Sequence, residues 1–184
     1  PFVLTENQTD IARHGDFLPA FHKLGKGGYD GKGVQRISSL ADQPKGFNAP
    51  GLLEKAVDFE KELAVIVARN ASGEIKAFPA VEMVFHPEHN LVDFLFSPAA
   101  ISNEIANKAE KLAIALIDKM GLVGVLAVEL FLTADGEILI NEVAPRPHNS
   151  GHQTIRGNET SQYDQHLRAI TGLPLGSTTA KGVS

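Results

Sequence analysis

Two apolar runs flank an Asp-Gly pair in the C-terminal third of the chain, and this feature most restricts how the chain can fold. The runs are Val125–Leu132 and Glu137–Val143, on either side of Asp135-Gly136. Asp-Gly between hydrophobic runs is a strong short-range signal for a β-hairpin. With a two-residue turn, the strands would pair so that Glu129 faces Glu142.

The register of this hairpin decides whether the two glutamates are neighbours. A four-residue loop would leave them diagonal on one face, whereas a three-residue loop would place them on opposite faces. Like charges directly opposite each other are destabilising unless a shared proton or a cation relieves the repulsion. Oxygen ligands in a chain without cysteine favour Mg²⁺, which usually implies a nearby phosphate. The hairpin alone leaves open the alternative that both acids lie on a solvated face.

The composition limits what kind of protein this can be. Its 184 residues suffice for one ordinary domain or two small lobes, and a hydrophobic content of 43% excludes disorder. No apolar run reaches the length of a membrane span, and a net charge of -5 with interspersed signs does not indicate nucleic acid or an anionic membrane as a partner. The first residues do not form a signal peptide. We therefore expect a cytoplasmic protein, of which this chain, lacking an initiator Met, is a piece.

The remaining pattern predicts strands around two helices. Apolar residues at helical spacing predict a helix over Ser102–Met120, which Ser102 caps and Gly121 ends. Its apolar face comprises Ile105, Ala109, Leu112, Ala113, Leu116, Ile117 and Met120. A second helix is expected over Ser161–Ile170. Strands are expected over residues 18–23, 34–37, 52–57, 63–69, 75–85 and 92–96. These elements predict an α+β fold with a mostly antiparallel sheet.

A glycine-rich segment, GKGGYDGKG, follows the first predicted strand. Its flexibility suits a loop whose amides wrap around a phosphate, although a plain flexible turn is equally compatible. It is not a Walker A loop, because Gly33 stands where Ser or Thr would hold the metal. Just before it, Lys23 ends an apolar strand and either reaches solvent or contacts phosphate as a point charge.

The order of strand lysine, glycine loop, acidic strand and glutamate hairpin resembles the ATP-grasp superfamily. More narrowly, the segments GGYDGKG, EKAVDFEKELAVIVARN, INEVAPRPHNSGHQTI and QYDQHLRAITGLPLG are similar to the N5-carboxyaminoimidazole ribonucleotide synthetase family. The resemblance runs from about Phe17 to Gly176. It implies an ATP-grasp fold with a small lobe over residues 1–57, a larger lobe over 58–176 and a tail over 177–184. The first and last domains of the parent enzyme would be absent.

The resemblance also implies roles in binding ATP and Mg²⁺. Lys23 would contact the phosphates, and residues 28–34 would close over them. Residues 54–57 would form a hinge strand that reads the adenine, although on the residues alone an ordinary edge strand is preferred, and Glu62 would hold the ribose. Glu129 and Glu142 would bind Mg²⁺. The implied nucleotide-binding residues are Lys23, Gly28, Tyr29, Asp30, Gly31, Lys32, Gly33, Val34, Glu54, Lys55, Ala56, Val57, Glu62, His86, Asn141 and Glu142.

The segment after the hairpin offers a planar guanidinium and several neutral polar groups. Arg146 suits phosphate or bicarbonate oxygens. His148 and His152 have the spacing of helical zinc ligands, but the neighbouring prolines and glycine disfavour a helix there. The resemblance implies substrate contacts by Arg146, His148, Asn149 and Ser150, and catalytic roles for Arg146, Tyr29 and Asp30.

The implied reaction is the ATP-dependent carboxylation of 5-aminoimidazole ribonucleotide by bicarbonate, through carboxyphosphate, in purine biosynthesis. This is the chemistry of an ATP-grasp carbon–nitrogen ligase, and the parent enzyme is expected to be a homodimer. We expect the fragment itself to have little activity. Two alternatives remain: another ATP-grasp ligase of purine synthesis, of the formate-dependent glycinamide ribonucleotide transformylase type, or a non-catalytic nucleotide-binding fragment.

Overall fold

The computed structural model describes residues 1–28, 32–85 and 92–183. The chain divides into two compact units, Pro1–Asp58 and Phe59–Ser184. Tyr29, Asp30, Gly31 and His86, four of the candidate site residues, lie outside the described residues.

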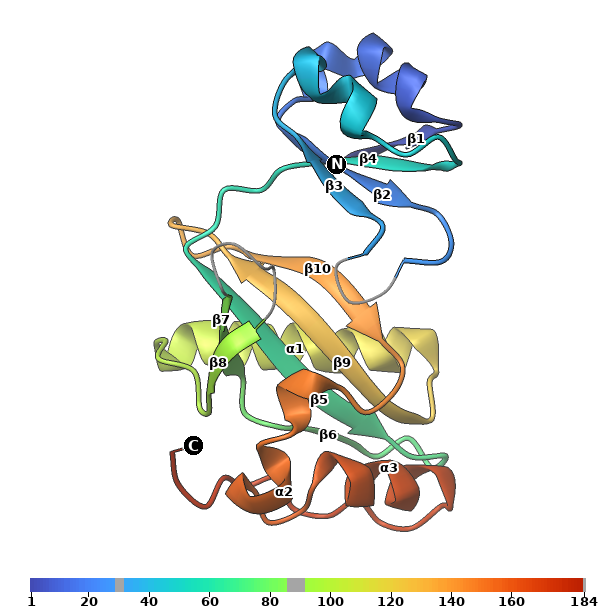
Figure 1. The fold of residues 1–184 in the computed structure, drawn as a ribbon. Helices are drawn as coiled ribbons and strands as arrows, with labels where there is room; N and C mark the ends of the chain where they lie inside the picture. Colours follow the sequence, from blue (N-terminus) through green and yellow to red (C-terminus); the bar gives the residue numbers. More distant parts are fainter. Residues whose placement is uncertain (29–31, 86–91, 184) are drawn as a thin grey trace. The chain divides into compact units, whose positions relative to one another are not determined.

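The N-terminal unit is a four-stranded antiparallel sheet with two 3-10 helices on it (Figure 1). The strand order is β1-β4-β2-β3, and the bounds are β1 Phe2–Thr5, β2 Ala20–Leu24, β3 Val34–Ile37 and β4 Gly51–Lys55. The helices are η1 Gln8–Phe17 and η2 Leu40–Lys45. The buried core of the unit consists of Ile11, Ala20, Ile37 and Leu53. The sequence patterns predicted β2, β3 and β4 but not β1 or the 3-10 helices, because short polar segments carry no regular hydrophobic period.

A buried histidine ties three parts of this unit together. The Nδ1 atom of His22 accepts a hydrogen bond from the backbone of Phe47 at 3.1 Å, and its Nε2 atom lies 2.9 Å from the Thr5 hydroxyl. Nδ1 is therefore unprotonated, and Nε2 carries the hydrogen that Thr5 accepts. Burial lowers the pKa of His22, because the charged imidazolium would lose its hydration. The neutral ring holds β2, the strand that carries Lys23, against its neighbours.

The second unit is built on a six-stranded antiparallel sheet of order β10-β9-β5-β7-β8, with β6 paired to β5 (Figure 1). The bounds are β5 Lys61–Arg69, β6 Ile75–Ala77, β7 Val81–Phe85, β8 Val92–Phe96, β9 Gly124–Leu132 and β10 Ile138–Ala144. The helices are α1 Asn103–Met120, α2 Thr154–Gly157 and α3 Gln162–Ile170, and a 3-10 turn, η3, covers Asn149–Gly151. The expected α+β architecture with a mostly antiparallel sheet is confirmed.

Helix α1 packs across one face of this sheet, lying behind it in Figure 1. The Ser102 hydroxyl accepts a hydrogen bond from Ile105 N at 3.3 Å, and Gly121 ends the helix in a left-handed conformation at φ 61°. The predicted apolar face is confirmed except at its last member. Met120 is 50% exposed and does not belong to the core cluster under the helix.

The predicted single strand over residues 75–85 is wrong in its middle. It is two strands, of which β6 pairs with β5 at Val67–Arg69 and β7 pairs with β5 at Glu62–Ala64. Pro79 lies between them and has no amide hydrogen to donate to a sheet ladder. The break shifts the chain along β5, so that β7 lies beside the end of β5 that carries Glu62.

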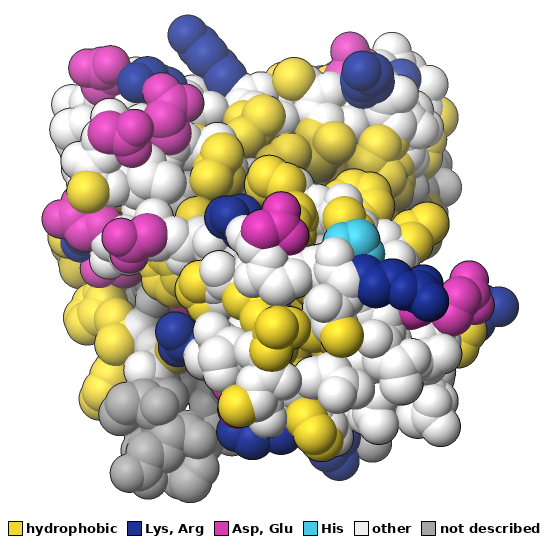
Figure 2. Space-filling model, turned by 90° about the horizontal axis from the view of Figure 1, so that it is seen from above, with side chains coloured by type: hydrophobic (Ala, Val, Ile, Leu, Met, Phe, Trp, Pro, Cys, Tyr) yellow, Lys and Arg dark blue, Asp and Glu magenta, His cyan; other side chains and the backbone are white. Residues whose placement is uncertain are grey.

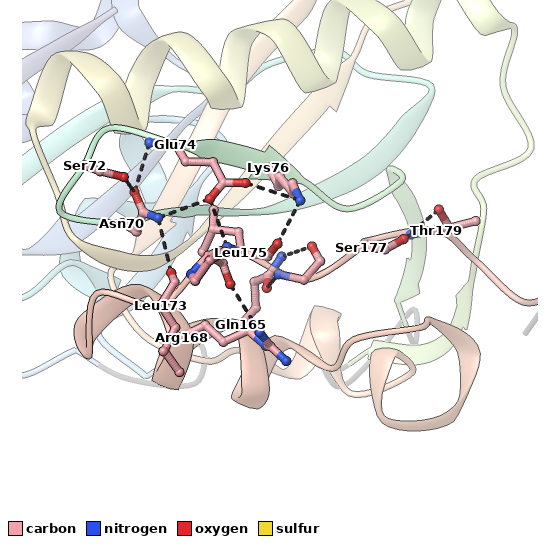
Figure 3. A network of polar contacts seen from close by, with 12 residues as sticks. Asn70, Ser72, Glu74, Lys76, Gln165, Arg168, Leu173, Leu175, Ser177 and Thr179 are labelled. Atoms are coloured by element: carbon pink, nitrogen blue, oxygen red, sulfur yellow. Dashed lines mark hydrogen bonds and ion pairs between the residues drawn. The ribbon is translucent and has the colours of Figure 1, made fainter.

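The segment after α3 is fastened to the turn between β5 and β6 by a network of polar contacts (Figure 3). The Asn70 amide donates to the backbone oxygen of Leu173 at 3.3 Å, and the Glu74 carboxylate accepts from Leu175 N at 2.9 Å. The Lys76 ammonium donates to the backbone oxygen of Leu175 at 2.8 Å. These contacts fix α3 and its following segment to the sheet.

The residues expected to form a tail pair back onto the second unit. Glu159 N donates to the backbone oxygen of Thr179 at 3.0 Å, and Lys181 N donates to that of Gly157 at 2.7 Å. None of the helices in the described part of the chain combines the length and the hydrophobicity that crossing a membrane requires.

Candidate functional site

The hairpin between β9 and β10 has a three-residue loop, so the predicted two-residue turn is wrong. Thr133 N donates to the backbone oxygen of Glu137 at 3.0 Å, and Leu132 pairs with Ile138. Gly136 ends the loop at φ 81°, a conformation that favours glycine. Continued regularly, this loop would have placed the two strand glutamates on opposite faces of the sheet.

A β-bulge restores the predicted pairing. The register shifts between Ile140 and Glu142, which leaves Asn141 as an extra residue in β10, and from there Glu142 faces Glu129. The prediction that the two glutamates are neighbours is therefore confirmed, through two shifts that compensate each other. Asn141, expected beside the acids, is the bulged residue itself.

A third carboxylate lies on the same face. Glu62 on β5 faces Phe131, two residues along β9 from Glu129, so the side chains of Glu62 and Glu129 leave the sheet on the same side. Burial and, to a smaller extent, the neighbouring charge of Glu129 raise the pKa of Glu62 to about 7. The coupling of Glu62 to Glu129 was not predicted from the sequence, because it depends on β5 lying beside β9.

The Glu129 carboxyl lies in an environment that disfavours its charge. Burial raises its pKa to about 7, with a contribution from Glu142, and the Arg146 guanidinium opposes the shift. The Nε2 atom of His148 lies 3.7 Å from its Oε1 atom. A partly buried carboxyl with a carboxylate opposite it gains from any added positive charge, and Mg²⁺ is often held by one or two carboxylates with phosphate oxygens and water. The pair therefore fits this ion.

The candidate residues in the segment after β10 differ in their exposure and contacts. Arg146 and Asn149 are exposed, whereas Ser150 is only 2% exposed. The Ser150 hydroxyl lies 3.0 Å from His148 Nδ1, and Ser150 N donates to the same atom at 3.4 Å. Ser150 thus holds the His148 ring, which leaves Nε2 directed to Glu129. The ring of His152 stacks on Tyr163 with centroids 6.5 Å apart.

The rings of His148 and His152 have different neighbours, since His148 lies beside Glu129 and His152 stacks on Tyr163. Within residues 1–28, 32–85 and 92–183, no group of three or more His, Cys, Asp or Glu side chains could hold a metal ion by itself. The expectation that the prolines and the glycine would prevent a continuous helix is confirmed, since η3 and the short α2 are separate. A metal ion on the glutamate pair would need further ligands from a phosphate or from water.

Two aromatic rings extend the carboxylate face. Phe59 and Phe131 are stacked with centroids 4.4 Å apart and an angle of 11° between the rings. A shallow hollow beside them is lined by Phe59, Glu62, Met83 and Phe85, among others. Neither stacked ring was predicted from the sequence to belong to the site. Phe131 could have been found, because it is two residues from Glu129 in an alternating strand.

In the N-terminal unit, the structure brings together Lys23 and Glu54. Their side chains form an ion pair, and both are partly exposed. They lie on adjacent strands, with Phe21 opposite Glu54. Lys55 ends β4, and Ala56 and Val57 follow it as coil. The predicted hinge strand therefore ends two residues early.

The described ends of the glycine loop are close together. Leu24 N donates to the backbone oxygen of Gly33 at 2.8 Å. Gly33 has φ 85°, and a Cβ atom there would lie 3.0 Å from the Gly28 Cα. A side chain at position 33 is therefore disfavoured by both conformation and space, so this glycine has a structural reason independent of any ligand.

The comparison with protein families identifies the class. A model of the ATP-grasp domain matches residues 2–163, which is most of the chain. The chain belongs to the ATP-grasp family, and the expected fold is confirmed.

Within this family the chain is most informatively compared with three relatives. It is 47% identical over 180 residues to the N5-carboxyaminoimidazole ribonucleotide synthase of Bacillus subtilis, covering 96% of this chain and 47% of that protein. A solved ADP complex of an N5-carboxyaminoimidazole ribonucleotide synthetase superimposes with a TM-score of 0.91 at 45% identity, covering 100% of this chain and 50% of that one.

A structure of the synthase from Aspergillus clavatus, in complex with ADP and 5-aminoimidazole ribonucleotide, has a TM-score of 0.84 at 32% identity and covers 98% of this chain and 50% of that one. The chain spans about half the length of the curated relatives it matches. The resemblance to this enzyme family, expected from the motifs, is confirmed.

Proposed function

We propose that this chain is the ATP- and Mg²⁺-binding part of an N5-carboxyaminoimidazole ribonucleotide synthase, an ATP-grasp carbon–nitrogen ligase of purine biosynthesis. The observation that carries the proposal is the pairing of Glu129 with Glu142 in neighbouring strands of the sheet. Burial and the charge of Glu142 raise the pKa of Glu129, and this fits a site that a cation completes. The 47% identity to a synthase over nearly the whole chain supports the specific reaction.

In the N-terminal unit, we assign Lys23 and residues 28–34 to the phosphates of ATP and residues 54–57 to its adenine. The ion pair of Lys23 with Glu54 supports this, since it holds the ammonium at the end of β2 beside the glycine loop. In the second unit, Glu62 is assigned to the ribose hydroxyls. The partly buried carboxyl of Glu62 has hydrogen-bond acceptors suited to two vicinal hydroxyls.

The glutamate pair would hold Mg²⁺, with Asn141 beside it. When bound, this ion would neutralise phosphate charge, which is the main requirement of phosphoryl transfer. Glu129 and Glu142, which face each other in the sheet, would supply the protein ligands of the ion. The Asn141 bulge contributes by setting that register.

The residues after β10 bind the other reactants in this proposal. We assign Arg146 to an oxyanion next to the glutamate pair, and its exposure and its effect on the pKa of Glu129 support this. Bicarbonate attacks the γ-phosphate of ATP, giving carboxyphosphate and ADP, and the amine of 5-aminoimidazole ribonucleotide then takes the carboxyl group and phosphate leaves. Tyr29, Asp30 and Asn149 are assigned to the ribonucleotide, whereas Ser150 acts through His148.

We assign the enzyme to the cytoplasm and propose that it is a homodimer, as the family resemblance implies. On the face that Figure 2 shows, acidic and basic side chains are mixed with hydrophobic ones, and this favours small-molecule substrates over nucleic acid as partners.

Calorimetric titration of ADP with and without Mg²⁺ tests the site. We expect wild-type binding to depend on Mg²⁺ and the dependence to be lost when Glu129 and Glu142 are both changed to Gln. Glu137→Gln on the same hairpin is the matched control, because Glu137 is exposed and outside the pair. Equal binding by all variants would separate the glutamates from the nucleotide and overturn the proposal.

Product analysis in the full-length protein tests the reaction. With ATP, bicarbonate and 5-aminoimidazole ribonucleotide we expect the N5-carbamate, ADP and phosphate. Product only with glycinamide ribonucleotide and formate would indicate the transformylase type of ligase instead. ADP binding without turnover on either amine would indicate a nucleotide-binding module.

A further inference from the structure

Helix α3 carries two buried glutamines that make the same kind of contact with different parts of the chain. Both Gln162 and Gln165 are 0% exposed. The amide of Gln165 donates to the backbone oxygen of Gly176 at 2.9 Å and accepts from its nitrogen at 2.8 Å, and Figure 3 shows this glutamine beside the segment after α3. Gln165 fastens a segment to which no reactant is assigned.

Gln162 makes the equivalent pair of bonds to His148. Its Oε1 atom accepts from His148 N at 2.9 Å, and its Nε2 atom donates to the His148 backbone oxygen at 2.7 Å. A side-chain amide here does what a neighbouring strand would do, satisfying both backbone groups of one residue. Without Gln162, the N–H and the C=O of His148 would need hydrogen-bond partners from water or from elsewhere in the protein.

The other end of the short segment is fastened through the same glutamine. Gln162 N donates to the Thr154 hydroxyl at 2.9 Å, and that hydroxyl donates to the backbone oxygen of Gly151 at 2.6 Å. A Cβ atom at Gly151 would lie 2.5 Å from Gln162 Oε1. The segment from His148 to Gly151 therefore packs directly on this amide, and the space is matched to a glycine.

Fixing the His148 backbone also fixes where its ring points. Ser150, inside the same fastened segment, contacts Nδ1, and Nε2 lies 3.7 Å from Glu129 Oε1. Without the Gln162 bonds, the segment would keep its covalent path between β10 and α2 but lose the two contacts that set the His148 backbone. A displacement of about 1 Å at such a residue can lower a rate by about a hundredfold.

We propose that Gln162 is a positioning residue: its amide holds the backbone of His148 so that the imidazole lies beside Glu129, at the place where the oxyanion reactant binds. This inference rests on the proposed function, since it names the residue that orders one wall of the same site. It requires an amide at position 162, because only an amide offers a donor and an acceptor in the required places.

The test compares Gln162→Met with Gln165→Met in the full-length protein. Both changes keep the length of the side chain, remove two hydrogen bonds to backbone and leave those groups unpaired, so both should lower the melting temperature by similar amounts. They differ only in which segment is released.

We expect Gln162→Met to lower kcat about ten- to hundredfold, with the KM for ATP changed less than about twofold. Gln165→Met should keep kcat within about twofold of wild type at a temperature where both variants are folded. Equal loss of kcat in both variants would mean a general effect of instability, and retained kcat in Gln162→Met would mean that His148 needs no fastening; either result overturns the inference.

The two proposals fail differently. Absence of turnover in the wild type refutes the proposed reaction and, with it, this role of Gln162. Wild-type turnover that Gln162→Met retains refutes only the role of Gln162. Mg²⁺-dependent ADP binding should be the same in wild type and both variants, which separates loss of the oxyanion wall from loss of the nucleotide site.

Discussion

The two faces of the six-stranded sheet differ in the side chains that they carry. One face is covered by α1 and consists of apolar side chains such as Leu63, Val65 and Leu126. The other face is apolar where α3 covers it and then carries Glu62 and Glu129, whose pKa values are raised by burial. The same strands supply both faces, because successive side chains point in opposite directions.

The difference shows that stability and binding are divided between the faces of the same strands. On the α1 face, the burial of apolar side chains stabilises the fold, and no ligand is assigned to this face. The carboxylate face holds charges at a cost to the folded state, and a cation would relieve that cost. Substitutions on the α1 face should therefore lower stability without changing the affinity for ADP. Removing a carboxylate from the other face should raise stability and lower that affinity.

The largest stability effect is expected on the packed face. Leu126→Ala should lower the free energy of unfolding by about 2–5 kcal/mol, because the vacated space lies under α1 and cannot be refilled. Urea denaturation measures the change. Leu139→Ala, at an exposed position on β10, is the control and should cost about 0.5 kcal/mol. The Mg²⁺-dependent affinity of folded Leu126→Ala for ADP should equal that of wild type, and a tenfold loss would break the comparison.

On the carboxylate face, removing a charge should stabilise the protein. Without metal at pH 8, Glu129→Gln should raise the free energy of unfolding by roughly 1–3 kcal/mol, because the folded state no longer has to hold a buried carboxylate opposite Glu142. The same variant should lose the Mg²⁺-dependent part of ADP binding. Urea denaturation and calorimetry measure the two effects, and a destabilised Glu129→Gln would contradict the view that this charge costs stability.

The pH dependence sharpens the same point. The folded pKa of Glu129 is about 7, above the ordinary value of 4.5, so between these values the folded state binds more protons than the unfolded state. The contribution of this carboxyl is thus fully present below about pH 4.5 and is lost as the pH rises through 7. Wild type should fall in stability relative to Glu129→Gln over this window, as unfolding midpoints at several pH values would show.

The comparison of wild type with Glu129→Gln removes titrating groups that do not interact with Glu129, whereas Glu62, which is coupled to Glu129, contributes to the difference in the same direction. His22 in the N-terminal unit has a lowered pKa, so it acts in the opposite direction: its contribution is present above its ordinary value of 6.5 and is lost as the pH falls below it. Because wild type and Glu129→Gln share His22, the difference between them leaves that contribution out. A difference that does not change with pH would refute the assignment of the window to Glu129.

The smallest effect is expected at the end of α1. Ser102→Ala should lower the free energy of unfolding by about 1 kcal/mol, because Ile105 N loses its hydrogen-bond acceptor. Ser102→Thr keeps a capping hydroxyl and should restore most of the loss. Thermal unfolding measures both. ADP affinity should not change, and a change would mean that α1 acts on the opposite face through the sheet.

Local patterns in the sequence were enough to predict most of the regular elements. The period of α1, its serine cap and its terminal glycine are all encoded within the helix and its two flanking residues, and the structure agrees with them. The strands of the hairpin were predictable for the same reason, whereas the two glutamates face each other only because the bulge at Asn141 offsets the three-residue loop. The family resemblance added roles that no local pattern contains, and most of these remain predictions.

What the local patterns missed depends on residues distant in the sequence. Pro79 is a local signal for a break, but only the assembled sheet shows that the strands on either side of it pair with different parts of β5. The coupling of Glu62 to Glu129 likewise exists only because β5 lies beside β9. A one-dimensional period cannot show which strands are neighbours.

The sequence by itself determined the amphipathic helix, the strands and the presence of paired acids, because these follow from short-range spacing and conformational preference. The tertiary structure decided the bulge at Asn141 that aligns the acids, the pKa values that follow from their burial, and the bonds of Gln162 to His148. These depend on the distances between atoms brought together from separate segments, and only packing sets such distances.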